Sequence, residues 1–301
     1  MLFAAKLDEI AGQSRRALRL QGPDARRFLS GCISGDLGAL APDQAVVAAL
    51  LTIKGKLVSE LVVLLADDGG AEAFDVWIPA DVFDEVARAL DEHLVMDDVA
   101  LVPQPQARAA VVWDDEGEAV VLPAPVRVVQ TRHPLPAQLA VADAAVLDAA
   151  LADASVMDAA DFHRARIESG TPGWGAELRP GFFPPEVGFV YAVSYDKGCY
   201  LGQEPLARLH ARGQVHRVLV RVVLEHPCAT PLPLRAPDRD DAGTLTTCVA
   251  EIAGAGGLAI VRRELASLST LLHTATEPPV PLRVVSTPLG DDAGVGGRNR
   301  S

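Results

Sequence analysis

The stretch DKGCYLGQEPLAR places a thiol close to a cation in a glycine-rich segment. Cys199 follows Lys197 by two residues, and Gly198 and Gly202 allow backbone conformations that are closed to other residues. We expect a helix to begin just after the second glycine. Its positive end and the lysine would favour the thiolate, which is the nucleophilic and metal-binding form. The alternative is a tight turn around a buried cysteine, and the residues alone leave both interpretations open.

A second stretch, RIESGTPGWGAEL, carries a candidate ligand carboxylate. Glu168 lies in the last turn of a predicted helix, where the helix dipole disfavours negative charge. A flat ring with adjacent N–H donors, such as a pterin, would offer it two parallel hydrogen bonds, and Trp174 could stack on that ring. The alternative is a surface glutamate paired with Arg164 and a tryptophan that fills the core. The residues alone favour this alternative, because most tryptophans are packing residues.

Composition limits the classes of function. The chain has 301 residues, and this length indicates two or three domains. Its net charge of -13 and its pI of about 4.9 disfavour a long basic groove for nucleic acid. The N-terminus has no signal-peptide pattern, and the apolar runs are far short of the ~20 residues that span a bilayer. We therefore expect a cytoplasmic protein. The four cysteines form no CxxC pair and no zinc-type spacing, and we expect free thiols, three of them in small core positions: Cys32, Cys228 and Cys248.

The first part of the chain predicts alternating strands and helices. Residues 15–32 predict a strand, a turn and a helix with Pro23 in its first turn. QAVVAALLTIKGKLVSELVVLLADD predicts a hairpin that turns at Gly55. FDVWIP predicts another strand, followed by a helix that Asp81 would cap. Together these elements predict an inserted α+β subdomain at about residues 45–105.

The second part of the chain predicts a helical region followed by a series of short strands. After short strands at VVW, AVVLP and RVVQT, a helical region follows that breaks near residues 155–158 and stops at Gly170. After Gly213, short strands separated by proline and glycine predict a small β-barrel or sandwich at 216–287. The last residues, 288–301, are predicted to be disordered.

The signature stretch resembles a known family. KGCYLGQE, followed by Ala207-Arg208 and Gly213, closely resembles the signature of the YgfZ-type folate-binding proteins, which are relatives of the glycine-cleavage aminomethyltransferase (T-protein). Other stretches resemble the family in the same order: LRLQGPDARRFLSG, ALLTIKGKLVSEL, RIESGTPGWGAEL with PPEVG, and HRVLV at the start of the barrel. The eight-residue signature is specific, and the other matches support it by their order and spacing.

The resemblance implies a fold, a role and a site. The fold would be α+β, with two interleaved α+β subdomains around a central folate channel in residues 1–215, followed by the C-terminal β-barrel. The role would be support for the assembly or repair of iron–sulfur enzymes, including enzymes that thiomethylate tRNA. The partners would be iron–sulfur enzymes or cluster-assembly proteins, with no direct nucleic-acid or membrane contact. The resemblance implies tetrahydrofolate as cofactor, a reactive Cys199 with Lys197 as catalytic residues, and cofactor-binding residues Glu168, Trp174, Tyr200, Gln203 and Arg208.

One departure separates the chain from the T-protein. The T-protein has paired aspartates after its hairpin glycines, whereas this chain has Ser59-Glu60 in the similar position. The longer glutamate moves the carboxylate by about a bond length, and catalytic placement is sensitive at that scale. A tetrahydrofolate-dependent aminomethyltransferase or demethylase is therefore the second interpretation. A third is a protein that keeps the fold without folate and acts only through partner contacts.

Overall fold

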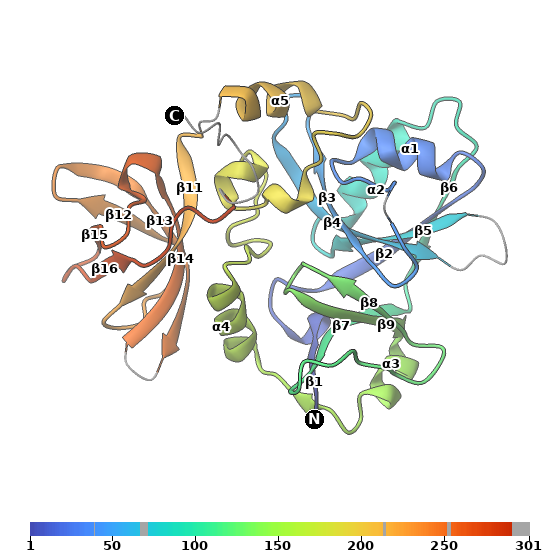
Figure 1. Cartoon of the computed structure of the whole chain (residues 1–301), viewed down its shortest axis with the longest axis horizontal. Coiled ribbons are helices and arrows are strands. Elements are labelled where there is room, and N and C mark those ends of the chain that lie inside the picture. The colour runs from blue at the N-terminus through green and yellow to red at the C-terminus, as the bar shows by residue number, and fades with distance from the viewer. Residues whose placement is uncertain (39, 67–71, 213–214, 252–253, 291–301) are drawn as a thin grey trace. The chain divides into compact units, whose positions relative to one another are not determined.

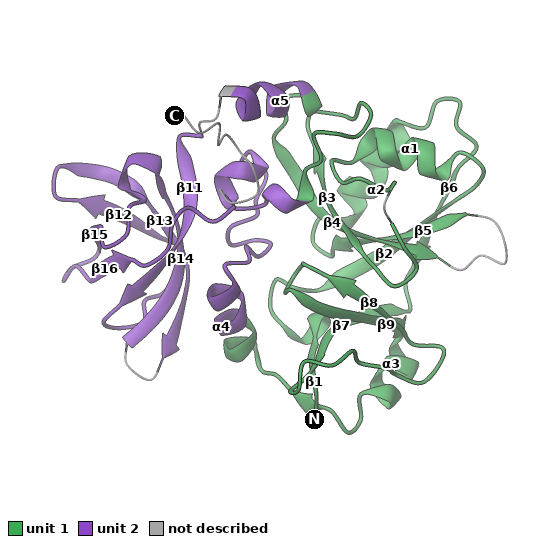
Figure 2. Ribbon diagram, in the orientation of Figure 1, with its two compact units in different colours: residues 1–162, 192–203 green, residues 163–191, 204–301 purple. Residues whose placement is uncertain are grey.

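The computed structural model of the chain describes residues 1–38, 40–66, 72–212, 215–251 and 254–290. These form two compact units, residues 1–162 with 192–203 and residues 163–191 with 204–301 (Figure 2). The second unit thus includes segments that the sequence grouped with the body, and the domain boundaries stay a prediction. No helix within the described ranges is long and apolar enough to cross a membrane.

The first unit contains a five-stranded sheet with the strand order β3-β4-β5-β2-β6 (Figure 1). Its elements are β2 (Arg15–Gln21), α1 (Ala25–Cys32), β3 (Val46–Leu51), β4 (Leu57–Ala66), β5 (Ala73–Pro79), α2 (Phe83–Glu92) and β6 (Ala100–Gln104). Alternate strand residues such as Leu61 and Phe74 share a core with Leu29 of α1 and Val86 of α2. The predicted strand–turn–helix and the hairpin around Gly55 are confirmed.

Two predicted details in this unit are wrong. The residue at the N-cap position of α2 is Val82 and not Asp81, because the chain turns just before the helix, where the Val82 N–H donates to the carbonyl of Pro79 at 3.2 Å. The sheet also includes β2, which pairs with both β5 and β6, and the bounds of the inserted subdomain stay a prediction. AVVLP forms no strand, since the Val120 N–H donates to the side-chain oxygen of Gln138 at 2.7 Å and not to a neighbouring strand.

A second five-stranded sheet completes the first unit, with the order β10-β1-β7-β9-β8. Its elements are β1 (Leu2–Lys6), the 3-10 helix η1 (Leu7–Glu9), β7 (Ala107–Asp114), β8 (Arg127–Thr131), β9 (Ala137–Asp143), α3 (Ala144–Ala150) and β10 (Ser155–Val156). The pairing of β1 with β10 is parallel, and the other pairings are antiparallel. Leu147 of α3 covers this sheet in a core with Ala110, Val112 and Ala140.

The second unit contains a closed barrel with the order β11-β14-β13-β12-β15-β16. Its strands are β11 (Arg217–Leu224), β12 (Leu232–Ala236), β13 (Arg239–Glu251), β14 (Gly254–Arg262), β15 (Leu271–Thr274) and β16 (Pro281–Val284). The predicted barrel after Gly213 is confirmed. Alternate residues of β11 lie in its core: Val218, Val220, Val222 and Leu224. The short 3-10 helices are η2 (Pro184–Val187), η3 (Val190–Ala192) and η4 (Arg263–Leu265).

Helices α4 (Ala159–Ser169) and α5 (Gln203–Arg212) each contain residues of both units. The predicted break before α4 is confirmed, and Gly170 ends this helix with a φ of 69°. The predicted disordered tail begins too early, because the Leu289 N–H donates to the Leu219 carbonyl at 2.8 Å. Gly213 and residues 291–301 lie outside the described residues.

Candidate functional site

Lys197 fixes the signature turn to the end of helix α1. Its Nζ donates hydrogen bonds to the carbonyl oxygens of Ser30 at 2.9 Å, Ile33 at 2.8 Å and Gly35 at 2.7 Å. The last carbonyls of a helix have no partner within it, and the helix dipole favours a cation there. An ammonium has three N–H donors, and these three carbonyls engage all of them. The geometry therefore gives Lys197 a positioning role, and none of its donors remains to assist a thiol.

One further hydrogen bond and one close backbone approach fix the position of the turn. The Leu201 N–H donates to the carbonyl of Gly31 in α1 at 3.0 Å. Gly202 has a φ of 80°, and a Cβ there would lie 2.5 Å from the carbonyl oxygen of Thr52 in the β3–β4 hairpin, so only glycine fits. Gly198 does not have a positive φ. The expected requirement for glycine therefore holds at Gly202 but not at Gly198.

We expect Lys197→Met to lower the free energy of unfolding by about 1–3 kcal/mol, because it leaves helix-end carbonyls without a donor. Burial lowers the pKa of Lys197 to about 8, so the ammonium is mostly present at neutral pH. Urea denaturation at pH 7, followed by tryptophan fluorescence, gives the unfolding midpoint. Lys54→Met removes an exposed lysine of the same unit and is the control. Equal midpoints for the two variants would contradict the positioning role.

Cys199 is the exposed member of the four free cysteines, all of which are described. Its alternative interpretation as a buried turn residue is therefore wrong. It lies at a pocket of about 480 Å³ in the first unit, whose lining residues are Arg26, Arg27, Ser30, Gly31, Asp36, Gly38, Lys197, Gly198 and Cys199. By contrast, burial raises the pKa of the nearby Cys32 thiol to about 11, which keeps it in its unreactive form. The turn thus presents one accessible thiol at a pocket whose lining includes Arg26 and Arg27. Their guanidinium groups pair with Glu72 and with Asp24 and Asp97.

The remaining signature residues have structural contacts. Tyr200 is buried, and its hydroxyl donates to the Ser194 carbonyl at 3.1 Å. Burial raises the pKa of this hydroxyl, so it stays protonated. Gln203 is the first residue of α5, as predicted, and its N–H donates to the Tyr200 carbonyl at 3.2 Å. Arg208 is exposed on α5 and pairs with Glu204 at 3.2 Å.

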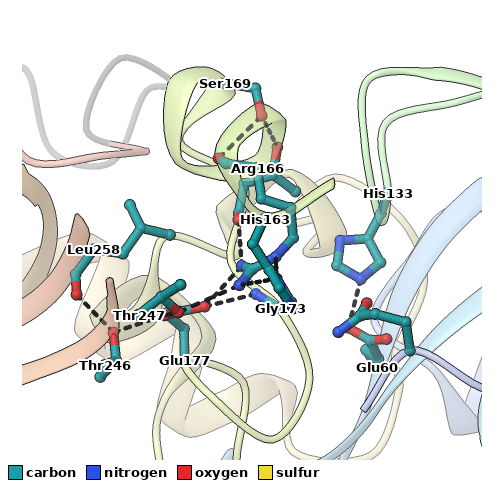
Figure 3. A network of polar contacts seen from close by, with 12 residues as sticks. Glu60, His133, His163, Arg166, Ser169, Gly173, Glu177, Thr246, Thr247 and Leu258 are labelled. Carbon is teal, nitrogen blue, oxygen red and sulfur yellow. Dashed lines mark hydrogen bonds and ion pairs between the residues drawn. The ribbon is translucent and has the colours of Figure 1, made fainter. Parts of the chain in front are cut away.

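In the second unit, the stretch after α4 is built around a buried ion pair (Figure 3). The Arg166 Nη1 atom donates to Glu177 Oε2 at 2.9 Å, and both side chains are almost fully buried. The hydroxyls of Thr246 and Thr247 in β13 donate to Glu177 Oε1 at 2.6 and 2.5 Å. Burial alone would raise the pKa of Glu177. The Arg166 charge and these hydrogen bonds lower the pKa by more than burial raises it, so the carboxylate stays charged.

This network explains why residue 173 is a glycine. The Gly173 N–H donates to Glu177 Oε2 at 2.9 Å, and a Cβ at Gly173 would lie 2.6 Å from the Arg166 Cζ atom. His163 accepts hydrogen bonds from Arg166 at 3.3 Å, and burial together with that cation lowers the pKa of His163 to about 4. Sequence reasoning missed Glu177 as a buried charge, because its threonine partners follow about 70 residues later in the chain.

Glu168 and Trp174 differ in their surroundings. Glu168 is exposed in the last turn of α4, and among the described residues its carboxylate has no hydrogen bond or ion pair. The alternative pairing with Arg164 is not found; that guanidinium donates to the Ala250 carbonyl at 3.4 Å. Trp174 is 5% exposed, which fits packing better than a stacking platform. The predicted site residues thus fall in both units: Lys197, Cys199, Tyr200 and Gln203 in the first, and Glu168, Trp174 and Arg208 in the second.

Glu60 of the Ser59-Glu60 pair is also buried and paired. Its Oε1 atom accepts from Arg15 Nη2, and its Oε2 atom lies 2.5 Å from His133 Nε2 (Figure 3). All three side chains are at most 3% exposed. Both carboxylate oxygens are therefore engaged inside the first unit. Within the described ranges, no cluster of three or more His, Cys, Asp or Glu residues could hold a metal ion.

Comparisons with known proteins agree with this architecture. No family model matches the chain. The chain is 27% identical over 233 residues to the mouse (Mus musculus) iron-sulfur cluster assembly factor IBA57, mitochondrial, which covers 71% of this chain and 65% of the relative. It is 28% identical over 222 residues to the tRNA-modifying protein YgfZ of Yersinia pseudotuberculosis, with 66% of each chain covered. The matched regions therefore span about two thirds of the length of these relatives.

The solved structure of the glycine cleavage system aminomethyltransferase T from Bartonella henselae has the same fold. It superimposes with a TM-score of 0.78 over 96% of this chain and 86% of that chain, at 14% sequence identity. Fold and barrel together define the class: an α+β protein with the aminomethyltransferase-like fold. Within that class, the predicted resemblance to the YgfZ-type proteins is confirmed by the similarity to YgfZ and to IBA57.

Proposed function

We propose that this chain is an accessory protein for the assembly or repair of iron–sulfur enzymes, with Cys199 as its reactive group. The observation that carries the proposal is the exposed Cys199 thiol on a turn anchored to α1, in a chain similar to proteins named for iron–sulfur assembly and tRNA modification. Its partners would be iron–sulfur enzymes or cluster-assembly proteins, including tRNA-thiomethylating enzymes. A cytoplasmic location stays a prediction.

The structure supports a thiol that acts on a macromolecular partner or its cluster. A thiolate binds iron and attacks disulfides, and both uses need an accessible sulfur. One cysteine alone does not hold a cluster, because such clusters are usually held by four protein ligands. Cys199 would therefore act together with groups that the partner supplies. A host strain that lacks this protein is expected to lose activity of an iron–sulfur tRNA-thiomethylating enzyme, and plasmid-borne wild-type protein is expected to restore it. Full enzyme activity without the protein would overturn the proposal.

We further propose tetrahydrofolate as the cofactor, with Glu168 as the residue that recognises its pterin. An exposed carboxylate without a partner among the described residues can accept two parallel hydrogen bonds from a pterin edge. It also sits where the helix dipole disfavours negative charge, so a ligand donor would relieve an unfavourable interaction. In contrast, Trp174 and Tyr200 are buried, which argues against a broad stacking contact of either ring with folate.

Glu168→Ala is expected to weaken tetrahydrofolate binding at least about tenfold, because it removes a charge-assisted pair of hydrogen bonds. Isothermal titration calorimetry of wild type and variant under anaerobic conditions measures the two dissociation constants. Glu277→Ala, which removes another exposed glutamate of the same unit, is the control and is expected to bind like wild type. No saturable binding by the wild type would remove folate from the proposal and leave the thiol role standing.

The second candidate is a tetrahydrofolate-dependent aminomethyltransferase or demethylase, which the fold favours. The geometry of Glu60 argues against it, because both carboxylate oxygens are engaged by Arg15 and His133. A buried and fully paired carboxylate is a poor general base, since proton transfer needs a partner within hydrogen-bond reach of the substrate. Turnover of an aminomethyl donor at saturating tetrahydrofolate would support this candidate, and loss of that turnover in Glu60→Gln would assign it to this residue.

A further inference from the structure

Two cysteines that are 20 residues apart in the sequence meet at the barrel of the second unit. The backbone N–H of Cys228, in the connection between β11 and β12, donates to the sulfur of Cys248 in β13 at 3.4 Å. Both side chains are half-buried against the barrel core. Sequence reasoning placed them separately as small core residues, because their spacing matches no redox or metal motif.

The geometry brings the two thiols within reach of each other. The N–Cα bond is about 1.46 Å, so the Cys248 sulfur lies at most about 4.9 Å from the Cys228 Cα atom. A disulfide joins the two sulfurs at about 2.05 Å with a Cβ–S–S–Cβ dihedral near ±90°. The Cys228 thiol now points to the His226 carbonyl, with the sulfur 3.7 Å from that oxygen. Rotation about its Cα–Cβ bond would break only this weak S–H···O hydrogen bond.

We propose that Cys228 and Cys248 are a dithiol pair that is converted to an intramolecular disulfide by a small-molecule disulfide oxidant such as oxidised glutathione. In the first step, the Cys228 thiolate attacks the oxidant, which forms a mixed disulfide and releases one reduced glutathione. The Cys248 thiolate then attacks the Cys228 sulfur and releases the second. The two protein thiols lose two electrons and two protons, and one glutathione disulfide becomes two glutathione thiols.

The environment sets the order of these steps. Burial raises the pKa of Cys248, so less of this thiol is thiolate and it is the poorer nucleophile toward the external oxidant. In the second step it only has to attack the Cys228 sulfur beside it. The resulting bridge would tie the β11–β12 connection to β13 and close a loop that contains all of β12. Closing such a loop stabilises a fold chiefly by constraining the unfolded chain. The inference does not depend on the proposed iron–sulfur role, because it involves neither Cys199 nor folate.

The test uses the full chain in a Cys199→Ser background, which removes the exposed thiol as a competitor. The reduced protein is equilibrated with oxidised and reduced glutathione, quenched with acid, alkylated and digested for mass spectrometry. We expect one cross-linked peptide that joins residues 228 and 248, a mass lower by two hydrogens, and full reversal by dithiothreitol. The unfolding temperature is expected to rise by roughly 4 °C or more on oxidation.

Three controls make the result decisive. The wild-type chain is treated in parallel, and glutathionylation of its Cys199 shows that the oxidant is active. Cys228→Ser and Cys248→Ser are each expected to lose the cross-link and the rise in unfolding temperature. Stable glutathione adducts on Cys228, or two unmodified thiols while Cys199 reacts, would overturn the proposal. Because the cross-link is read in a chain that keeps both cysteines, poor folding of a serine variant does not affect this outcome.

Discussion

Glu177→Ala is expected to lower the free energy of unfolding by about 3–5 kcal/mol, the largest effect of any single substitution proposed here. The reason is the Arg166 guanidinium, which is almost fully buried and would lose its carboxylate. The hydroxyls of Thr246 and Thr247 would lose the same acceptor. Breaking a buried pair costs more than the pair contributes, because it leaves one charge desolvated without compensation.

Trp174 provides a local fluorescence probe for this measurement. It is the only tryptophan of the second unit, since the other two are Trp77 and Trp113. Urea unfolding in a Trp77→Phe/Trp113→Phe background would therefore report the unit that contains Glu177. The double substitution Arg166→Met/Glu177→Met is expected to recover part of the loss, because it removes both charges together. A loss below about 1 kcal/mol for Glu177→Ala would show that the pair is not buried as described.

The second large effect is expected at Glu60. Glu60→Ala leaves Arg15 and His133 buried without their shared carboxylate and is expected to cost about 3 kcal/mol. The cost is lower than at Glu177, because Glu177 also accepts hydrogen bonds from the Thr246 and Thr247 hydroxyls and the Gly173 N–H, which would all lose their acceptor.

The matched control for Glu60 is Glu72→Ala. Glu72 also pairs with an arginine of the first unit, but that pair with Arg26 is partly exposed, and such pairs contribute little to stability. Urea unfolding in a Trp174→Phe background reads the first unit through its own tryptophans. If Glu60→Ala and Glu72→Ala unfold at the same midpoint, the burial argument fails, and with it the objection to Glu60 as a catalytic base.

Much of the fold was predictable from local patterns. The short strands of the C-terminal barrel and the strand–turn–helix of residues 15–32 are confirmed, because the apolar period and the turn residues act over a few positions. AVVLP shows the limit: it has a strand composition, but its Val120 N–H is taken by a side chain of β9. The place of β2 between β5 and β6 also depends on long-range pairing that no local pattern records.

The sequence indicated where a candidate site lies but not what each of its residues contacts. The resemblance implied a reactive Cys199, while the residues alone left an accessible and a buried cysteine open. The structure has Cys199 exposed, and α5 begins at Gln203, just after Gly202, as expected. The role of Lys197 was not predictable, because its acceptors at the end of α1 precede it by more than 160 residues. The same holds for Cys228 and Cys248, whose contact depends on how the barrel closes.

The most direct test of the account is the rescue of iron–sulfur enzyme activity by Cys199→Ala. Cells that lack this protein are complemented with wild type, Cys199→Ala or Cys32→Ala at equal protein levels, and the activity of a tRNA-thiomethylating iron–sulfur enzyme is measured. Cys32 is a buried thiol of the same unit and controls for the loss of a cysteine. We expect Cys32→Ala to restore activity and Cys199→Ala to restore less than about a tenth of it. Full rescue by Cys199→Ala would contradict the central role of this thiol.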